Sequence, residues 1–147
     1  MGAIRTVRLL VVEDDPGYRY LVQRAFSARG EETRWELTTA KDGEEALQAL
    51  FEEEGERARL PDLILLDWNL PKVSGNEVLR RVKRDQARRR IPVLVFSSST
   101  SDKDIRAAYE EHANGNIVKP SGIDALDAVV ERIERFWSKF CLRASRA

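Results

Sequence analysis

The 147-residue sequence contains one cysteine, Cys141, so it has no internal disulfide framework. It has no apolar run near the roughly 20 residues of a transmembrane helix. Residues 1–8 are too few and too charged for a signal peptide. The 25 basic residues equal the 25 acidic residues, so net charge does not favour general binding to nucleic acid or acidic membranes. These absences predict a soluble, cytoplasmic, single-domain protein.

The hydrophobic residues, which make up 42% of the chain, occur in two alternating patterns. Short apolar or alternating runs predict five strands, at residues 7–12, 34–40, 63–66, 91–96 and 115–118. Apolar residues at helical spacing predict five helices, from Pro16 to a stop at Gly30, over 44–54, from Ser74 or Gly75, from Ser101 or Asp102, and from Gly122 to about Phe140. This alternation predicts a parallel α/β sheet with helices on both faces.

Polar side chains capable of chemistry follow four of the five predicted strands. They are Glu13 and Asp14, then Asp67 and Asn69, then Ser97, then Lys119. Because parallel α/β sheets bind ligands at the carboxyl ends of their strands, we expect these groups to meet at one edge. Taken singly, each has a simpler explanation as a helix cap, a loop hydroxyl or a surface lysine. Together, clustered carboxylates indicate a site for a hard divalent cation.

Four segments in this order resemble the receiver domain of two-component response regulators, over about residues 6–137. They are Leu10–Asp15, Leu65–Pro71, Val95–Ser98 and Ile117–Pro120. The resemblance implies a flavodoxin-like fold with a five-stranded parallel sheet in the order 2-1-3-4-5. It also implies one receiver domain over residues 1–147, in which 138–147 extend and follow the last helix, with no output domain.

The same resemblance implies a role for each residue of the constellation. Asp67 is the phosphoacceptor, which takes a phosphoryl group from the phosphohistidine of a histidine kinase. Mg²⁺ (or Mn²⁺) is bound by Asp14, Asp67 and the backbone carbonyl of Asn69, while Glu13 orients a metal-bound water. Ser97 and Lys119 contact the phosphoryl group and transmit its arrival. The only chemistry expected is the protein's own phosphorylation and dephosphorylation, so it is not an enzyme with a separate substrate.

Two features bear on signal output. Asn116 stands where the family usually has an aromatic residue that rotates on activation, so we expect an altered switch. Phe136, Trp137 and Phe140 form an aromatic end to the last helix, which predicts a homodimer through the fourth helix, fifth strand and fifth helix. This ending, with the Asn69–Pro71 segment, resembles small regulators that partner phytochrome-type histidine kinases. The residues after this helix are too few for a DNA-binding unit, so direct DNA binding is not expected.

Three other functions are less consistent with the sequence. An aspartyl-phosphate hydrolase would need a substrate-binding cap and a general acid, for which the sequence has no evident candidate. A flavodoxin-like cofactor site would need hydroxyls and glycines after the first strand, where the chain has Glu13–Pro16. A pseudo-receiver used only for docking would not need the intact acceptor, acidic pair and lysine. The basic segment from Lys83 to Arg90 is expected to be solvated.

Overall fold

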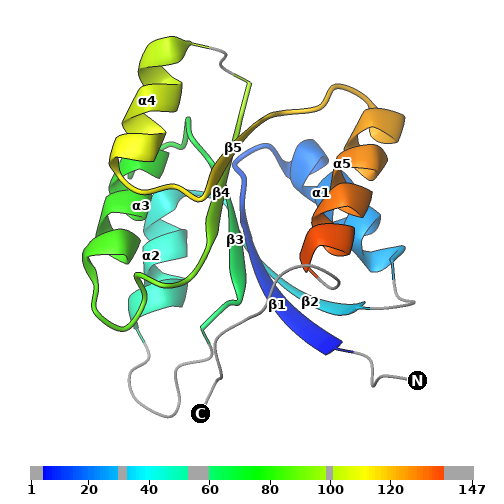
Figure 1. Cartoon of the computed structure of the whole chain (residues 1–147), viewed down its shortest axis with the longest axis horizontal. Coiled ribbons are helices and arrows are strands. Elements are labelled where there is room, and N and C mark those ends of the chain that lie inside the picture. Colours follow the sequence, from blue (N-terminus) through cyan, green and yellow to red (C-terminus); the bar gives the residue numbers. More distant parts are fainter. Residues whose placement is uncertain (1–4, 30–32, 53–59, 99–100, 138–147) are drawn as a thin grey trace.

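The computed structural model describes residues 5–29, 33–52, 60–98 and 101–137. Five strands and five helices alternate along the chain, in the order β1 (Arg5–Val12), α1 (Pro16–Ser27), β2 (Thr33–Ala40), α2 (Gly43–Phe51), β3 (Leu63–Asp67), α3 (Gly75–Arg84), β4 (Val93–Ser97), α4 (Asp102–Glu110), β5 (Gly115–Val118) and α5 (Ile123–Arg135). The strands form one parallel sheet in the order β2-β1-β3-β4-β5 (Figure 1). The predicted fold class and strand order are confirmed.

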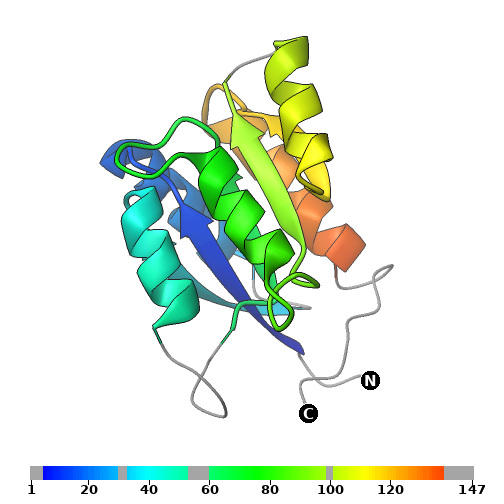
Figure 2. The same cartoon turned by 90° about the vertical axis from the view of Figure 1, so that its left-hand side faces the viewer.

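The sheet separates two helical layers, each with its own hydrophobic cluster. Helices α1 and α5 cover one face, whereas α2, α3 and α4 cover the other (Figures 1 and 2). Phe26 and Leu126 are buried beneath the first layer. Leu50 and Leu79 are buried beneath the second. Every residue of β3 is buried because this central strand is covered on both faces. The more polar β2 lies at the sheet edge, as its alternating sequence predicts.

Helix caps fix the loops that leave the carboxyl ends of the strands. The Asp15 side chain accepts from the Gly17 backbone N–H at 2.9 Å and begins α1. Asp42 does the same for α2 by accepting from the backbone N–H of Glu45 at 2.7 Å. A cap satisfies a donor that the first helical turn leaves unpaired. These caps set where each helix begins relative to the preceding strand.

Several predicted boundaries differ from the structure. Strand β4 begins at Val93 rather than residue 91, because Pro92 has no backbone N–H to donate to the sheet. It continues to Ser97, which is therefore a strand residue. Helix α2 begins at Gly43, one residue before the predicted start, and ends at Phe51, before the predicted end at residue 54. The predicted stop at Gly30 and the predicted helix end at Phe140 lie outside the described residues.

The basic segment after α3 is more ordered than its charge suggests. Lys83 Nζ donates to the carbonyl oxygens of Arg89 and Ile91 at 3.1 and 2.8 Å, and to Asn114 Oδ1 at 2.9 Å. Burial lowers the pKa of Lys83. Arg88 is buried, and its guanidinium lies 4.5 Å from the centre of the Phe51 ring. The expectation of solvated charge is therefore wrong for Lys83 and Arg88, because both side chains bridge separate elements.

The buried carboxylate of Glu134 attaches the C-terminal end of α5 to β2 and to the segment after α1. Glu134 accepts from Trp35 Nε1 in β2 at 2.9 Å and from Arg29 Nε, just after α1, at 3.0 Å. The Trp35 ring also meets the edge of Phe26, with 4.8 Å between ring centroids. This network holds the C-terminal end of α5 against β2 and the end of α1. Across the described ranges, no helix has both the length and the apolar character to cross a membrane.

Candidate functional site

Asp67 is the last residue of β3, and its side chain lies at the carboxyl edge of the sheet. It is only 5% exposed. Its Oδ1 accepts from the Asn69 backbone N–H at 3.2 Å, which shapes the turn after the strand. The start of α3 packs closely on this turn, since a Cβ on Gly75 would lie 2.4 Å from the Asp67 carbonyl oxygen. The residue type at position 75 therefore controls where the Asp67 backbone lies.

The strand register brings the predicted residues to this edge. Val12 pairs with Leu66, so Glu13 follows β1 at the level of Asp67. Asp67 itself pairs with Phe96, and Ser97 pairs with Val118. The Lys119 backbone N–H then donates to the Ser97 carbonyl oxygen at 2.9 Å. Residues at or just beyond the ends of four neighbouring strands therefore lie along the same edge of the sheet.

Three carboxylates form a compact acidic group at this point. Glu13, Asp14 and Asp67 each place an oxygen within 4.8 Å of the others. Glu13 and Asp67 are buried, whereas Asp14 is exposed to solvent. Oxygen donors at this density suit a hard divalent cation that keeps some of its water ligands. The donor set therefore fits Mg²⁺ or Mn²⁺.

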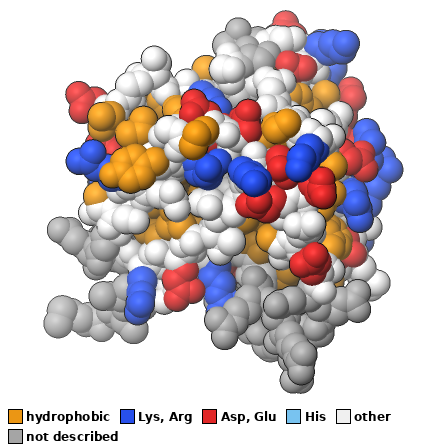
Figure 3. Space-filling view, turned by 180° about the vertical axis from the view of Figure 1, so that it is seen from behind, with side chains coloured by type: hydrophobic (Ala, Val, Ile, Leu, Met, Phe, Trp, Pro, Cys, Tyr) orange, Lys and Arg blue, Asp and Glu red, His pale blue; other side chains and the backbone are white. Residues whose placement is uncertain are grey.

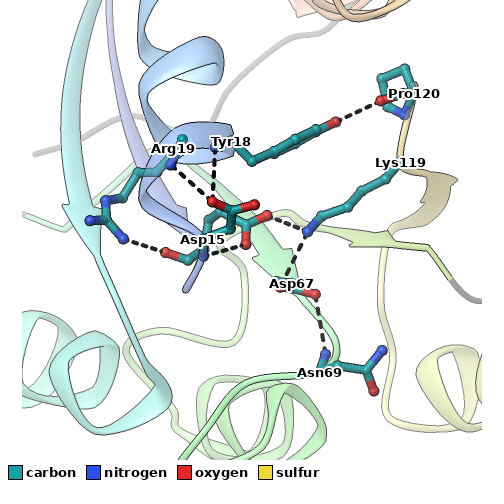
Figure 4. Close-up of polar contacts among 9 residues, drawn as sticks. Asp15, Tyr18, Arg19, Asp67, Asn69, Lys119 and Pro120 are labelled. Atoms are coloured by element: carbon teal, nitrogen blue, oxygen red, sulfur yellow. Dashed lines mark hydrogen bonds and ion pairs between the residues drawn. The ribbon is translucent and has the colours of Figure 1, made fainter. Parts of the chain in front are cut away.

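Lys119 supplies the positive charge of the site. Its Nζ lies 3.4 Å from Asp67 Oδ2 and forms a close ion pair with Glu13 Oε1 (Figure 4). Lys119 follows β5, so it approaches Asp67 from the opposite side to β1. The ammonium is positioned to contact any group that becomes bonded to Asp67.

Burial perturbs the protonation of these groups. Desolvation raises the pKa of Glu13 to about 7, although its hydrogen bond with Lys119 acts in the opposite direction. Desolvation also raises the pKa of Asp67, against the lowering effect of the Lys119 charge. Burial opposes the charge of Lys119, but its hydrogen bond with Glu13 and the charge of Asp67 raise its pKa overall. Burial therefore disfavours the charged forms of Glu13 and Asp67, and a bound cation would favour those forms.

The other predicted residues lie around this centre. The Ser97 side chain is buried at the end of β4, next to Asp67's strand. Asn116 lies in β5, opposite Val95, and is half-buried. Asn69 shapes the turn through its backbone N–H, and the use of its carbonyl as a metal ligand stays a prediction. The roles of Ser97 and Asn116 in switching also stay predictions.

Sequence reasoning missed two residues of the first turn of α1. Arg19 Nη1 donates to the Glu13 carbonyl oxygen at 2.8 Å. The Tyr18 hydroxyl donates to the Pro120 carbonyl oxygen at 3.1 Å (Figure 4). Their signal was position: both follow the acidic segment within five residues, at the edge that carries the site. The Tyr18 ring also packs against the hydrophobic cluster under α1 and α5, so this side chain has both a packing contact and a polar contact.

The aromatic residues at the end of α5 divide into two environments. Phe136 is 57% exposed, whereas Trp137 is 6% exposed and packs in the α1–α5 hydrophobic cluster. Trp137 is therefore a poor candidate for the predicted dimer interface, because its indole packs against the core. Phe140 lies outside the described residues. The dimer stays a prediction, and of the two described residues Phe136 is the exposed one.

Other surface features bear on partners. Tyr109, Val118 and Ile123 are each at least half exposed, and they come from α4, β5 and α5. On the face shown in Figure 3, basic and acidic side chains are interspersed with hydrophobic ones, without one dominant sign. This distribution matches the balanced charge of the sequence.

Comparisons with known proteins agree on one family. A family model for the response regulator receiver domain matches residues 9–131. Probable methanogenesis regulatory protein FilR2 of Methanothrix harundinacea is 43% identical over 129 residues, which span 88% of this chain and 82% of the relative. Response regulator Rcp1 of Synechocystis is 38% identical over 130 residues, which span 88% of this chain and 87% of Rcp1.

Solved structures extend the likeness to three dimensions. The phosphorylated cyanobacterial phytochrome response regulator RcpA matches with a TM-score of 0.86 and 39% identity, over 95% of this chain and 99% of RcpA. The Mn²⁺-bound form of Rcp1 matches with a TM-score of 0.82 and 35% identity, over 95% of this chain and 99% of Rcp1. The structure of RcpA is of a phosphorylated protein and that of Rcp1 is of a Mn²⁺-bound protein, and both have this fold.

Proposed function

This chain belongs to the response regulator receiver domain family, and we propose that it accepts a phosphoryl group on Asp67 from the phosphohistidine of a histidine kinase. The observation that carries the proposal is the position of Asp67. Its buried carboxylate lies 3.4 Å from the Lys119 ammonium and forms a compact acidic group with Glu13 and Asp14. A nucleophile, a cation and a metal-binding donor set therefore converge on one point.

In the proposed reaction, a carboxylate oxygen of Asp67 forms a bond to phosphorus while the bond from phosphorus to the histidine nitrogen breaks. The electron pair of that bond leaves with the imidazole, and Asp67 becomes an aspartyl phosphate. Lys119 stabilises negative charge on the phosphoryl oxygens, and its interactions with Glu13 and Asp67 raise its pKa, which favours the charged ammonium. Most of the catalysis in such transfers is positioning and electrostatic stabilisation, which a rigid sheet edge provides.

Asp14, Asp67 and the Asn69 carbonyl would hold Mg²⁺, with Glu13 orienting a water beside it. When bound, the ion supplies positive charge that offsets the charge of the phosphoryl group and the carboxylates. The compactness of the three carboxylates supports this proposal. The Mn²⁺-bound form of Rcp1, a protein 38% identical to this chain, supports it independently.

The decisive experiment is phosphotransfer from a labelled histidine kinase to the wild type and to Asp67→Asn. We expect labelling of the wild type that depends on Mg²⁺, and none of the variant. Asp124→Asn is the matched control, because it changes an exposed carboxylate in the first turn of α5 that does not belong to the acidic group of Glu13, Asp14 and Asp67. Retained labelling of Asp67→Asn would refute the assignment.

We propose a phytochrome-type kinase as the partner, because RcpA, 39% identical, is described as a phytochrome response regulator. FilR2, 43% identical, is described as a probable methanogenesis regulator, so the kinase panel should include sensors unrelated to light. Preferential phosphotransfer from the phytochrome-type kinase is the expected result. Faster transfer from an unrelated sensor would refute the partner while leaving Asp67 as acceptor.

Output is proposed to occur through protein contacts, including a homodimer formed by α4, β5 and α5, in the cytoplasm. The exposed Tyr109, Val118 and Phe136 support this face. Phe136→Glu should give a monomer in sedimentation, because it places a charge in an apolar contact. Truncation before Trp137 is a poorer test, since that residue belongs to the core. A Phe136→Glu protein that still sediments as a dimer would remove this residue from the interface.

A further inference from the structure

Tyr18 joins the first turn of α1 to the segment that carries Lys119. The Asp15 side chain, which accepts from the Gly17 backbone N–H at 2.9 Å and from that of Tyr18 at 3.4 Å, fixes the start of this turn. From there the Tyr18 side chain extends across the edge of the sheet to Pro120, above the Lys119 side chain (Figure 4). Tyr18 and Pro120 are 102 positions apart in the sequence.

Tyr18 makes two different contacts with this segment. Its hydroxyl donates to the Pro120 carbonyl oxygen at 3.1 Å, which fixes the backbone immediately after Lys119. Its ring lies 4.7 Å from Lys119 Nζ, measured to the ring centroid, a distance typical of a cation–π contact. Burial raises the pKa of Tyr18, which favours the protonated hydroxyl that donates this hydrogen bond.

The lysine that these contacts restrain is a flexible side chain on which the reaction depends. Lys119 has four carbon atoms between its backbone and its ammonium, and many rotamers would direct that ammonium to solvent. Glu13 and Asp67 attract it from one side. The Tyr18 ring contacts it as well, and the hydroxyl restricts the backbone from which it extends. A cation held in place before the reaction costs less reorganisation during it.

We propose that Tyr18 is a positioning residue for phosphoryl transfer, which holds the Lys119 ammonium beside Asp67 and fixes the Lys119–Pro120 segment. The inference rests on the proposed function, since it assumes that Asp67 is phosphorylated. It assigns to Tyr18 more than packing, although the ring also borders the hydrophobic cluster under α1 and α5. The two contacts make different predictions, because one needs the hydroxyl and the other needs only the ring.

The test compares the wild-type protein with three variants. Tyr18→Phe keeps the ring and removes the hydrogen bond. Tyr18→Leu removes both contacts. Tyr20→Leu is the matched control, because Tyr20 lies two residues along the same helix and is 61% exposed. Acetyl phosphate serves as phosphodonor: Asp67 bonds to phosphorus, the bond from phosphorus to the acetate oxygen breaks, and acetate leaves with the electron pair. The rate of phosphorylation is measured with Mg²⁺ present, beside Mg²⁺ affinity and beryllofluoride affinity.

We expect Tyr18→Phe to slow phosphorylation about 3-fold and Tyr18→Leu about 10-fold, from the typical strengths of a hydrogen bond and a cation–π contact. Beryllofluoride affinity, which reports contacts to a phosphoryl-like group, should fall in the same order. Mg²⁺ affinity should stay within about 2-fold of wild type in every variant, because the hydroxyl and ring contacts of Tyr18 go to Pro120 and Lys119 rather than to a carboxylate of the acidic group. Tyr20→Leu should match the wild type in all three measurements.

Two results would overturn the inference. One is a Tyr18→Leu protein that is phosphorylated at the wild-type rate. The other is a loss of Mg²⁺ affinity as large as the loss of rate, which would mean that the whole edge had collapsed. A wild type that acetyl phosphate and every kinase fail to label would refute the proposed function instead. Because Tyr18→Phe preserves the ring volume, it tests the hydrogen bond even if Tyr18→Leu does not fold.

Discussion

Replacing Gly75 by alanine should destabilise the protein, although alanine is the better helix former. Gly75 is the first residue of α3, where propensity alone favours alanine by about 0.5–1 kcal/mol. The structure reverses this expectation. The added Cβ would lie 2.4 Å from the Asp67 carbonyl oxygen and 2.8 Å from the Trp68 Cα, and real Cβ atoms essentially never come within 3.0 Å of such atoms.

The cost follows from which atoms are in the way. Both are backbone atoms of the turn after β3, so no side chain can rotate to make room. Overpacking of this kind typically costs about 1–3 kcal/mol. After the gain in helix propensity, we expect a net loss of about 1–2 kcal/mol in the free energy of unfolding. Displacing the Asp67 backbone should also slow its phosphorylation.

Gly17→Ala is the matched control. Gly17 also lies in the first turn of a helix, but its Cβ would meet only Asp15 Oδ1 at 3.4 Å, an ordinary contact. It should therefore stabilise the protein by about 0.5–1 kcal/mol. Urea denaturation followed by circular dichroism measures both variants, and a phosphorylation assay measures the site. A Gly75→Ala protein at least as stable as the wild type would refute the reasoning, as would equal losses in both variants.

Three further predictions concern buried charge and the metal. Burial raises the pKa of Glu13 from 4.5 to about 7, so between these pH values the folded protein binds more protons than the unfolded chain. Without divalent cations, the free energy of unfolding from denaturation curves should therefore fall by on the order of 2 kcal/mol as pH rises from about 4.5 to 7. Glu13→Gln should flatten this pH dependence, and an unchanged slope would contradict the assignment to Glu13. Lys83→Met should cost about 2–4 kcal/mol in the same assay, because three oxygens lose a charged donor, and a loss below 1 kcal/mol would contradict that role. Mg²⁺ should change the fluorescence of Trp68, which is buried beside Asp67, and a signal that persists in Trp68→Phe would have to come from another tryptophan.

The sequence was sufficient to predict the centre of the site because strand ends are informative. In a parallel sheet, the residue that follows each strand has only one edge to occupy, so the positions of Glu13, Asp67 and Lys119 in the chain translated directly into space. The strand order and the alternation of layers followed from the same regularity and the family resemblance. Boundaries were less certain where Pro92 shortened a strand.

The remaining features depended on how far side chains reach. Lys83 is held partly by Asn114, 31 residues away, and nothing local in the sequence links them. Trp137 follows the regular part of α5, and periodicity could not tell that its ring returns to the core. Tyr18 shows the same difficulty. Helical spacing indicates which face a residue occupies, but not that its hydroxyl reaches a neighbouring loop.

The buried Glu134 also determines how α5 can move. This helix has 13 residues and is therefore about 20 Å long. Glu134 holds its far end through Trp35 and Arg29, whereas its near end follows Pro120 and the positive-φ residue Gly122. A displacement of the Pro120 segment would therefore act first on the N-terminal end of α5, since hydrogen bonds of Glu134 hold the C-terminal end. A partner that binds at Ile123 would therefore contact the end of the helix that moves more, whereas a partner that binds at Phe136 would contact the end that moves less.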